Sequence, residues 1–222
     1  MTKTLPYVIT ISRQLGCGGA YLGQRLAIRL NVLYLDHEII RQAAQELKIP
    51  EEYLVSRDEK VTSHWQSILQ SIAYSNSWSY APPPLDILND GKLYNVESDI
   101  INRIASQRPA VIVGRGGYYV LRNNPRCLSI FLHANVEFRQ QRVMELYHVS
   151  AEQALKLISS VDQERARYLR ALTGQDGLDA RQYHLCLDTS ALGLEKSEVI
   201  ILEALHARFV DIEAKTQEIP GD

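Results

Sequence analysis

A glycine-rich turn near the N-terminus constrains the fold of this chain more than any other feature. The turn reads Ser-Arg-Gln-Leu-Gly-Cys-Gly-Gly-Ala over residues 12–20, after the apolar run Tyr7–Ile11 and before an amphipathic stretch at about 20–30. A strand, a glycine-rich turn and a helix in this order aim backbone N–H groups at a phosphate. The segment therefore predicts a phosphate-binding turn in an α/β fold. The alternative is a tight strand-to-helix turn without a ligand.

The turn lacks the side chains with which a phosphate loop usually works. In the pattern G-x-x-x-x-G-K-[ST], Arg13 stands at the first glycine, Gly19 at the lysine and Ala20 at the hydroxyl residue that binds Mg²⁺. The turn is not a dinucleotide fingerprint either, because Tyr21 occupies the last glycine position of G-x-G-x-x-G. Its glycines still permit φ > 0 and a close approach of phosphate to the backbone. Phosphate binding is predicted, without the usual cation and hydroxyl.

Size and charge narrow the classes of protein to which the chain can belong. It has 222 residues, with 24 basic and 26 acidic side chains. This length predicts a single domain over residues 1–222 with a substantial core. The near balance of charge gives no bulk attraction to nucleic acid or to a membrane surface. The apolar runs are too short to span a bilayer, and the N-terminus has no signal-peptide apolar region, so we expect a cytoplasmic protein.

Cysteines and histidines form neither a disulfide framework nor a metal pattern. Cys17, Cys127 and Cys186 are far apart, and the last two lie in or beside strand-like apolar runs. Both are therefore predicted to be buried thiols. The six histidines show no metal-ligand spacing. We predict no metal site held by protein side chains.

Apolar, β-rich runs alternate with helical patterns along the chain. The predicted strands are Tyr7–Ile11, Val32–Leu35, Ala110–Val113, Leu128–Leu132 and His184–Leu187. The predicted helices, with apolar residues at a 3.6-residue period, lie at about 20–30, 37–48, 96–107, 135–147, 150–171 and 196–213. Ser150 with Gln153 indicates a capping box for the fifth of them. Near-continuous apolar strands between helices predict a parallel sheet covered on both faces.

Unusual residues follow the predicted strands, at the carboxyl ends where parallel sheets bind ligands. Arg13 and Gly16 follow the first strand, Asp36 the second, Arg115 the third and Asp188 the last. Arg115 lies between glycines and can hold a phosphate bidentately; the alternative is a surface arginine in a loop. Asp36 is expected to cap the next helix. The less favoured interpretation is that it contacts the substrate or a Mg-bound water. Asp188 opens a turn that could face a nucleotide base.

A second group of arginines lies near the end of the predicted helix at 150–171. It consists of Arg165, Arg167 and Arg170. An arginine-bearing flap that closes over phosphates and excludes water is what phosphoryl transfer needs. The alternative is a solvated helix face on which these arginines pair with Asp162 and Glu164.

The segment at about 50–95 breaks the alternation of strands and helices. It combines three consecutive prolines at 82–84 with two tryptophans, several tyrosines and many serines. We predict an insertion over the ligand edge of the sheet, which is also a candidate surface for homo-oligomer formation.

Six short motifs keep a fixed order along the chain. They read Val-Ile-Thr-Ile-Ser-Arg-Gln at 8–14, Gly-x-Gly-Gly at 16–19, Tyr-x-Asp at 34–36, Val-Ile-Val-Gly-Arg at 111–115, Arg-Ala-x-Tyr-x-Arg-x-x-Thr-Gly at 165–174 and Asp-Thr-Ser-x-Leu-Gly at 188–193. Together they resemble the cytidylate kinase-like family, a group related to bacterial cytidylate kinases within the P-loop nucleoside monophosphate kinases. The resemblance runs from about residue 6 to 205 and is weakest at 60–95.

The resemblance implies a three-layer P-loop kinase fold, with a five-stranded parallel sheet, helices on both faces, the substrate-side insertion and an arginine-bearing lid at about 160–182. ATP and Mg²⁺ are the implied cofactors. By similarity, the residues that take the donor phosphates are Ser12, Arg13, Gly16, Cys17, Gly18, Gly19 and Ala20. Those that face the acceptor are Asp36, Arg41, Arg115 and Arg181. The residues implied in catalysis are Arg13, Arg115 and the lid arginines Arg165, Arg167 and Arg170.

The chain departs from the family at two places. The family commonly has an arginine after Gly-Gly, where this chain has Ala20. The family's Trp-Gly-Asp-Pro stretch after Thr-Gly reads Asp-Gly-Leu-Asp-Ala at 176–180, without the tryptophan and the proline. The first hypothesis is an ATP- and Mg-dependent phosphotransferase that acts on a nucleoside monophosphate such as CMP or dCMP. The second is a degenerate P-loop protein that binds a nucleotide without turnover, in a regulatory or assembly role. The third is a kinase for a small acceptor that is not a nucleotide.

Overall fold

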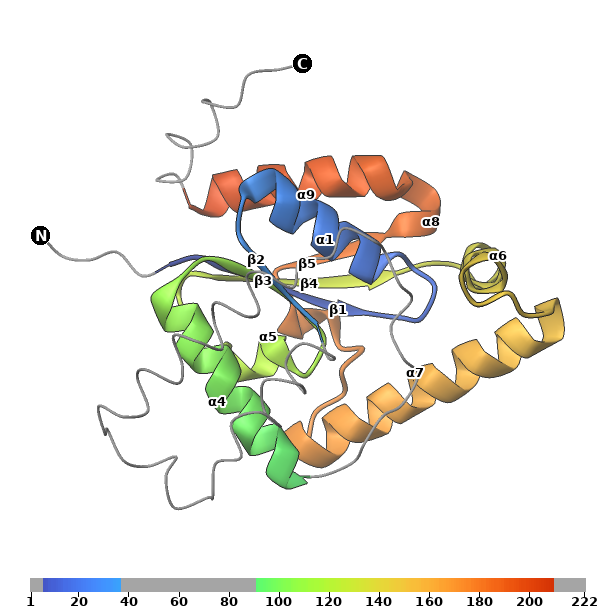
Figure 1. Cartoon of the computed structure of the whole chain (residues 1–222), viewed down its shortest axis with the longest axis horizontal. Coiled ribbons are helices and arrows are strands. Elements are labelled where there is room, and N and C mark those ends of the chain that lie inside the picture. The colour runs from blue at the N-terminus through green and yellow to red at the C-terminus, as the bar shows by residue number, and fades with distance from the viewer. Residues whose placement is uncertain (1–5, 37–90, 210–222) are drawn as a thin grey trace, which may run out of the picture.

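A five-stranded parallel sheet forms the centre of the molecule (Figure 1). The computed structural model describes residues 6–36 and 91–209. The strands are β1 (Val8–Arg13), β2 (Leu33–Leu35), β3 (Ala110–Val113), β4 (Cys127–His133) and β5 (Leu185–Asp188). They run in the order β2-β3-β1-β4-β5, and each neighbouring pair is parallel. The predicted sheet is confirmed, with the glycine-rich turn at the end of its central strand.

Helices cover both faces of the sheet, as predicted (Figure 1). On one face lie α1 (Gly19–Leu30) and α9 (Leu194–Arg208), and on the other α4 (Gly91–Gln107) and the short α5 (Gly117–Val120). The helices α6 (Val136–Tyr147) and α7 (Ala151–Thr173) pack against each other beyond the carboxyl ends of the strands. A 3₁₀ turn (Ala180–Gln182) precedes β5, and α8 (Thr189–Leu192) follows it.

The strands are mostly apolar because helices bury most of their residues on both faces of the sheet. Ile9 and Ile11 of β1 join a cluster with side chains of α1 and α9. Val8 points to the opposite face, where it joins Ile112 of β3 and Ile104 of α4. Since side chains alternate along a strand, a sheet covered on both faces needs apolar residues at successive positions. This packing on both faces fixes the positions of the carboxyl ends of the strands. It therefore also fixes the turns that follow those ends.

The structure corrects the sequence prediction at several points. Helix α4 begins at Gly91, so the end of the predicted insertion is helical. Cys186 is exposed rather than buried, because β5 is an edge strand of the sheet, whereas Cys17 and Cys127 are buried. The short α5 and α8 were not foreseen. The helix predicted at 37–48, most of the insertion and its proposed oligomer surface lie outside the described residues. In the part of the chain that is described, no helix is both long and apolar enough to cross a membrane.

The long helix α7 has well-defined ends. The Ser150 hydroxyl accepts the N–H of Gln153 at 3.3 Å, and the Gln153 side chain accepts the N–H of Ser150 at 2.8 Å. The predicted capping box is therefore present. Gly174 ends the helix in the left-handed conformation, with φ 69°. The two caps fix where α7 begins and ends. They therefore help to fix which side chains of α7 face the glycine-rich turn.

We expect Ser150→Ala to lower the free energy of unfolding by about 1 kcal/mol, because an N–H of the first turn of α7 loses its acceptor. Chemical denaturation measures the change. Ser160→Ala is the matched control, since that serine lies on the exposed surface within α7, and it should leave stability equal or slightly higher. Equal effects of the two substitutions would contradict a capping role.

Candidate functional site

The turn after β1 takes a shape that only glycine permits at its critical position. Gly16 and Gly18 have φ of 85° and 88°. A Cβ at Gly16 would lie 2.7 Å from the backbone oxygen of Arg139, so a side chain there would force the backbone apart. The Thr189 hydroxyl donates to the backbone oxygen of Cys17 at 2.8 Å. The turn is thus held from α6 on one side and from α8 on the other.

Helix α1 begins in this turn and presents its N-terminus there. The Leu22 N–H bonds to the backbone oxygen of Gly18, and the N–H groups of the first helical turn precede it. Gly18 is the N-cap, with no side-chain cap, and the first turn carries no acidic residue. The partial positive charge of the helix end therefore stays available to an anion.

The Cys17 thiol lies inside the turn and donates to the backbone oxygen of Leu132 at 3.4 Å. Burial raises the pKa of this thiol, which keeps it protonated. Cys17 is a small packing residue here rather than a reactive thiolate.

The side chain of Arg13 lies across two glycines. Its stem packs against Gly19, where a Cβ would lie 2.8 Å from both Cβ and Cγ of Arg13, and its guanidinium lies against Gly114 at the end of β3. Burial lowers the pKa of Arg13, and the positive charge of Arg115 acts in the same direction, while the nearby charge of Asp36 opposes them. The Arg13 side chain is thus held close to the turn by its contacts with two glycines.

A second guanidinium reaches the same place from α7. Nη1 of Arg165 donates to the backbone oxygen of Arg13 at 3.4 Å and lies 4.0 Å from a carboxylate oxygen of Asp162. Burial lowers the pKa of Arg165, and the positive charge of Arg13 lowers it further. Two like charges held side by side favour an anion between or beside them.

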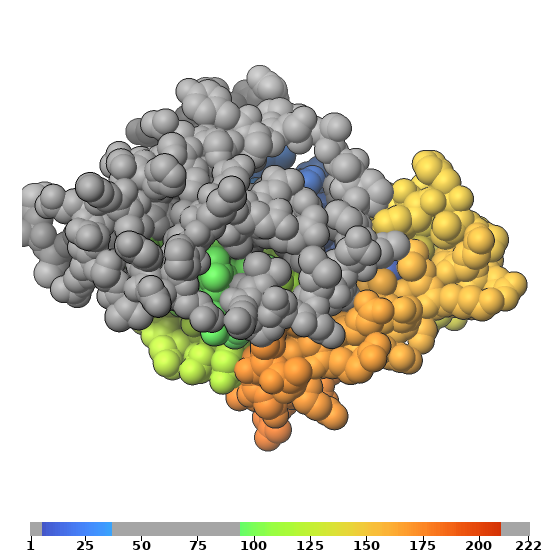
Figure 2. Space-filling view, turned by 60° about the horizontal axis from the view of Figure 1, so that its bottom comes forward, coloured from blue at the N-terminus to red at the C-terminus, as the bar shows by residue number. Residues whose placement is uncertain are grey.

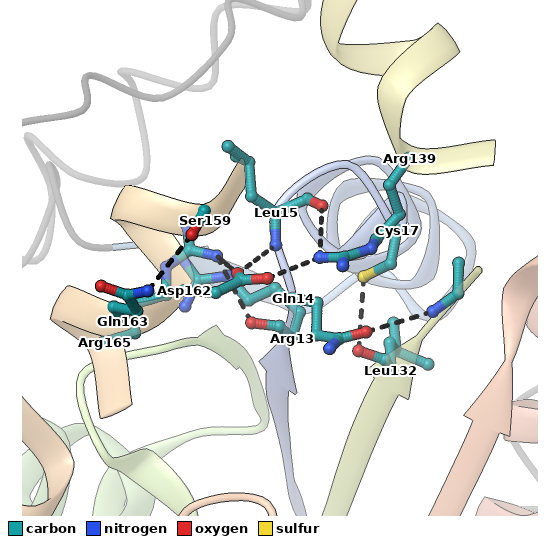
Figure 3. Close-up of polar contacts among 11 residues, drawn as sticks. Arg13, Gln14, Leu15, Cys17, Leu132, Arg139, Ser159, Asp162, Gln163 and Arg165 are labelled. Carbon is teal, nitrogen blue, oxygen red and sulfur yellow. Dashed lines mark hydrogen bonds and ion pairs between the residues drawn. The ribbon is translucent and has the colours of Figure 1, made fainter. Parts of the chain in front are cut away.

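Asp162 fastens α7 to the turn (Figure 3). Its carboxylate accepts the N–H of Leu15 at 2.8 Å and Nη1 of Arg139 at 2.5 Å. The same Arg139 nitrogen lies 3.4 Å from the backbone oxygen of Leu15, to which it donates. In the space-filling view, α6 and α7 lie side by side at one end of the molecule (Figure 2). Asp162 therefore sets the distance between the arginines of α7 and the glycine-rich turn.

Arg115 is fixed in direction by a buried ion pair. It has φ 52°, and its Nε donates to a carboxylate oxygen of Glu97 at 2.8 Å, with a second bond from Nη2 to the same oxygen. Glu97 is fully buried on α4, and Arg115 is 8% exposed. The guanidinium lies 4.8 Å from the centre of the Tyr168 ring of α7. One side of the arginine is thus occupied by Glu97 and one face by an aromatic ring.

Two hollows meet at the Arg13–Arg165 pair. The larger has a volume of about 120 Å³, and its lining includes Arg115, Tyr168 and Tyr183. The smaller, of about 30 Å³, lies over Gly16 and the start of α1. Arg13 and Arg165 line both hollows. Two groups bound in them would meet beside these two charges.

The structure brings together some of the residues predicted for the site. Ser12, Arg13, Arg115 and Arg165 line the larger hollow, while Gly16, Gly18, Gly19 and Ala20 line the smaller. Asp36 directly follows β2, and its charge acts on Arg13. Arg167 and Arg170 lie on the exposed side of α7, and Arg181 is exposed and bonded to Asp179. Asp188 accepts N–H groups of α8 as its N-cap. Arg41 lies outside the described residues.

Several residues of the site were not predicted as such. Glu97, Arg139 and Tyr168 belong to this group, and Asp162 was weighed only as a surface partner of the arginines. A charged residue within an amphipathic helix gives no sequence signal that it is buried. The Asp162 position did carry one hint, since it lies three residues before Arg165 on one face of α7.

The described residues do not fit a magnesium site held by protein side chains. Ala20 carries no hydroxyl where a phosphate loop has one. Across residues 6–36 and 91–209, no group of three His, Cys, Asp or Glu side chains could hold a metal ion. Mg²⁺ in kinase sites is commonly held by substrate phosphates and water with one or two carboxylates.

Comparison with known proteins gives a family and a fold. The model of the cytidylate kinase-like family matches residues 8–191. An uncharacterized protein from Eubacterium ventriosum is similar in structure, with a TM-score of 0.68 and 20% identity over 91% of this chain and 99% of that one. A gluconokinase from Sinorhizobium meliloti has a TM-score of 0.50 and 12% identity over 94% of this chain and 99% of that one. At these identities the structures show a shared fold alone. No curated protein matches the chain.

We expect inorganic tripolyphosphate to stabilise the protein. An anion between Arg13 and Arg165 relieves their repulsion, and a ligand at about 100 times its Kd adds about 2.7 kcal/mol. For a chain of this size the melting temperature should rise by about 5–10 °C. Thermal melts in tripolyphosphate, against sodium chloride of equal ionic strength, measure the shift. Equal melting temperatures in the two salts would contradict an anion site.

Removing the charge of Asp162 should destabilise the protein. In Asp162→Asn the bonds from Leu15 and Arg139 lose their charged acceptor, at a cost of about 1.5–3 kcal/mol. Glu152→Gln is the matched control, because its partner Lys156 is exposed and such pairs contribute about 0–1 kcal/mol. Chemical denaturation compares the two. A loss in the Asp162 variant no larger than in the control would contradict the fastening role.

Proposed function

Because this chain belongs to the cytidylate kinase-like family, we propose that it transfers the terminal phosphate of ATP to a nucleoside monophosphate of the CMP or dCMP kind. The observation that carries the proposal is the pair of hollows that meet at Arg13 and Arg165. A transferase needs two adjoining binding places and positive charge where they meet.

The donor phosphates are assigned to the smaller hollow. The first-turn N–H groups of α1 and the glycine backbone of the turn suit a phosphate chain. Arg142 of α6 also lines this hollow, and its guanidinium packs over the ring of Phe138. Backbone donors and three arginines, counting Arg13 and Arg165, favour a highly charged ligand such as a triphosphate.

The acceptor is assigned to the larger hollow. Arg115 is held in place by Glu97, and the N–H groups of its guanidinium that do not bond to Glu97 are suited to the acceptor phosphate. Tyr168, Tyr183 and Phe131 supply aromatic surface around it. Planar rings of this kind favour a flat base over a polyhydroxylated acceptor, whose hydroxyls need many polar partners.

In the proposed reaction an oxygen of the acceptor phosphate attacks the γ-phosphorus of ATP. The bond from this phosphorus to the β–γ bridging oxygen breaks, and ADP leaves. Little proton transfer is required, so the work of the site is alignment and neutralisation of the spreading negative charge. Arg13 and Arg165 lie where the two hollows join and are the groups assigned to that charge. Mg²⁺ is proposed to arrive with the ATP phosphates, and no step is assigned to it.

The lid is retained as a proposal for the segment at about 160–182. Arg167, Arg170 and Arg181 are exposed on this segment. They would act on the phosphates only after a closing movement. A cytoplasmic location is likewise proposed from the sequence.

A second function is favoured by a specific observation. Gly19 and Ala20 remove the cation and the hydroxyl of a standard phosphate loop, and the described residues offer no metal ligand cluster. The chain would then bind a nucleotide without turning it over, as a sensor or an assembly partner.

The two functions are separated by ADP formation. With ATP and Mg²⁺ we expect turnover over a panel of ribo- and deoxynucleoside monophosphates, and the highest kcat/KM with a cytidine acceptor. Sugar and polyol acceptors in the same assay test for a kinase with a non-nucleotide substrate. If no ADP forms with any acceptor of the panel at high protein concentration, while ATP binding is still measurable, the transferase hypothesis is wrong. The result would then favour a protein that binds a nucleotide without turnover.

Arg115→Lys should weaken binding of the acceptor and leave binding of ATP unchanged. Lysine keeps the charge beside Glu97 but loses the planar fork that binds phosphate bidentately. We expect KM for the acceptor to rise about 10–100-fold, as for the loss of one charged hydrogen bond, with KM for ATP unchanged. Arg122→Lys is the control, because that arginine is exposed just beyond α5, where it donates to the backbone oxygen of Tyr119 and lies over the ring of the same residue. An equal rise in KM for ATP would argue against an acceptor role.

A further inference from the structure

We propose that Arg13 supplies the charge that a lysine provides in other phosphate loops, and that Gly19 is glycine because the Arg13 side chain fills the space above it. The two positions would then be exchanged as a pair: a cation at 13 with glycine at 19, or glycine at 13 with lysine at 19. The catalytic part of this inference rests on the proposed function, and the binding part does not.

The contact between Arg13 and Gly19 makes the two choices mutually exclusive. A Cβ at Gly19 would lie 2.8 Å from both Cβ and Cγ of Arg13. Neither of these atoms is the free end of the side chain, so Arg13 cannot yield by a simple rotation of its tip. A lysine at 19 would therefore displace the arginine, and the arginine excludes the lysine.

A second glycine makes room for the charged end of the same side chain. The guanidinium of Arg13 lies against Gly114, and a Cβ at Gly114 would overlap Nη1. Gly114 also has φ 88°, a conformation that favours glycine. The Arg13 side chain thus lies along two positions, Gly19 and Gly114, that carry no side chain of their own. Its guanidinium can therefore reach from the end of β1 to the place where the two hollows meet.

The charges around Arg13 point to an anionic ligand rather than to a structural ion pair. Besides burial, the positive charge of Arg115 lowers the pKa of Arg13, and that of Arg13 lowers the pKa of Arg165, while the carboxylate of Asp36 acts on Arg13 in the opposite direction. The described lining of the smaller hollow includes Arg13, Arg142 and Arg165 but no acidic residue. A phosphate chain entering there would meet the Arg13 guanidinium at the point where a loop lysine usually acts.

The test exchanges the two residues and measures binding as well as turnover. Arg13→Gly, Gly19→Lys and the double variant are compared with wild type, with inorganic tripolyphosphate as the calorimetric probe and ADP formation as the activity. Arg13→Gln is added because it keeps the bulk of the side chain and removes the charge. Arg29→Gln, at the exposed far end of α1, removes one positive charge away from the site.

We expect Kd for tripolyphosphate to rise about 10–100-fold in Arg13→Gly and in Arg13→Gln, as for the loss of one charged hydrogen-bonding group. The rate of ADP formation should fall about 10²–10³-fold. Gly19→Lys alone should also weaken binding, because it displaces Arg13. The double variant should regain most of the affinity and rate, and Arg29→Gln should remain close to wild type.

Two outcomes would overturn the inference. The first is an Arg13→Gln protein that binds tripolyphosphate as tightly as wild type. The second is a folded double variant that recovers no more than Arg13→Gly does. The proposed function fails separately: if wild type binds tripolyphosphate but forms no ADP with any acceptor, the binding data still decide the role of Arg13.

Discussion

Three guanidinium groups crowd the end of the central strand, and their mutual repulsion has to be balanced by the rest of the fold. Arg13 comes from β1, Arg115 from the turn after β3 and Arg165 from α7. Charges held this close are costly unless carboxylates or a bound anion offset them. Glu97 balances Arg115 from α4, and Asp162 balances Arg139 and lies near Arg165. The sheet and the helices α4, α6 and α7 therefore all contribute to one electrostatic centre.

The same centre explains why helices distant in sequence are placed as they are. Asp162 joins α7 to Leu15 and to Arg139 of α6, although Leu15 and Asp162 are 147 residues apart in the sequence. Tyr168, one helical turn beyond Arg165, lies against the guanidinium of Arg115. A single helix thus touches the turns after β1 and β3 together. Movement of α7 would change both hollows at once, which is what a closing segment requires.

Most of the fold was predictable because the strands and long helices carry strong periodic patterns. A strand buried on both faces is apolar at successive positions, and the long helices show a 3.6-residue period. The four-residue α5 and α8 were missed because they are too short to show any period. The exposure of Cys186 was missed as well, since an apolar run does not reveal whether its strand lies at the edge of the sheet.

The five strands, the glycine-rich turn and the family motifs follow from the amino-acid sequence, because local pattern and residue type suffice for these. Which arginines gather depends on the folded arrangement of the helices: Arg165 points to the turn while Arg167 and Arg170, on the same helix, point outward. The fold also buries Glu97 against Arg115 and places Arg13 over Gly19. These contacts join segments that are distant along the chain or fold back on one another, and pairwise charge and volume govern them rather than any local period.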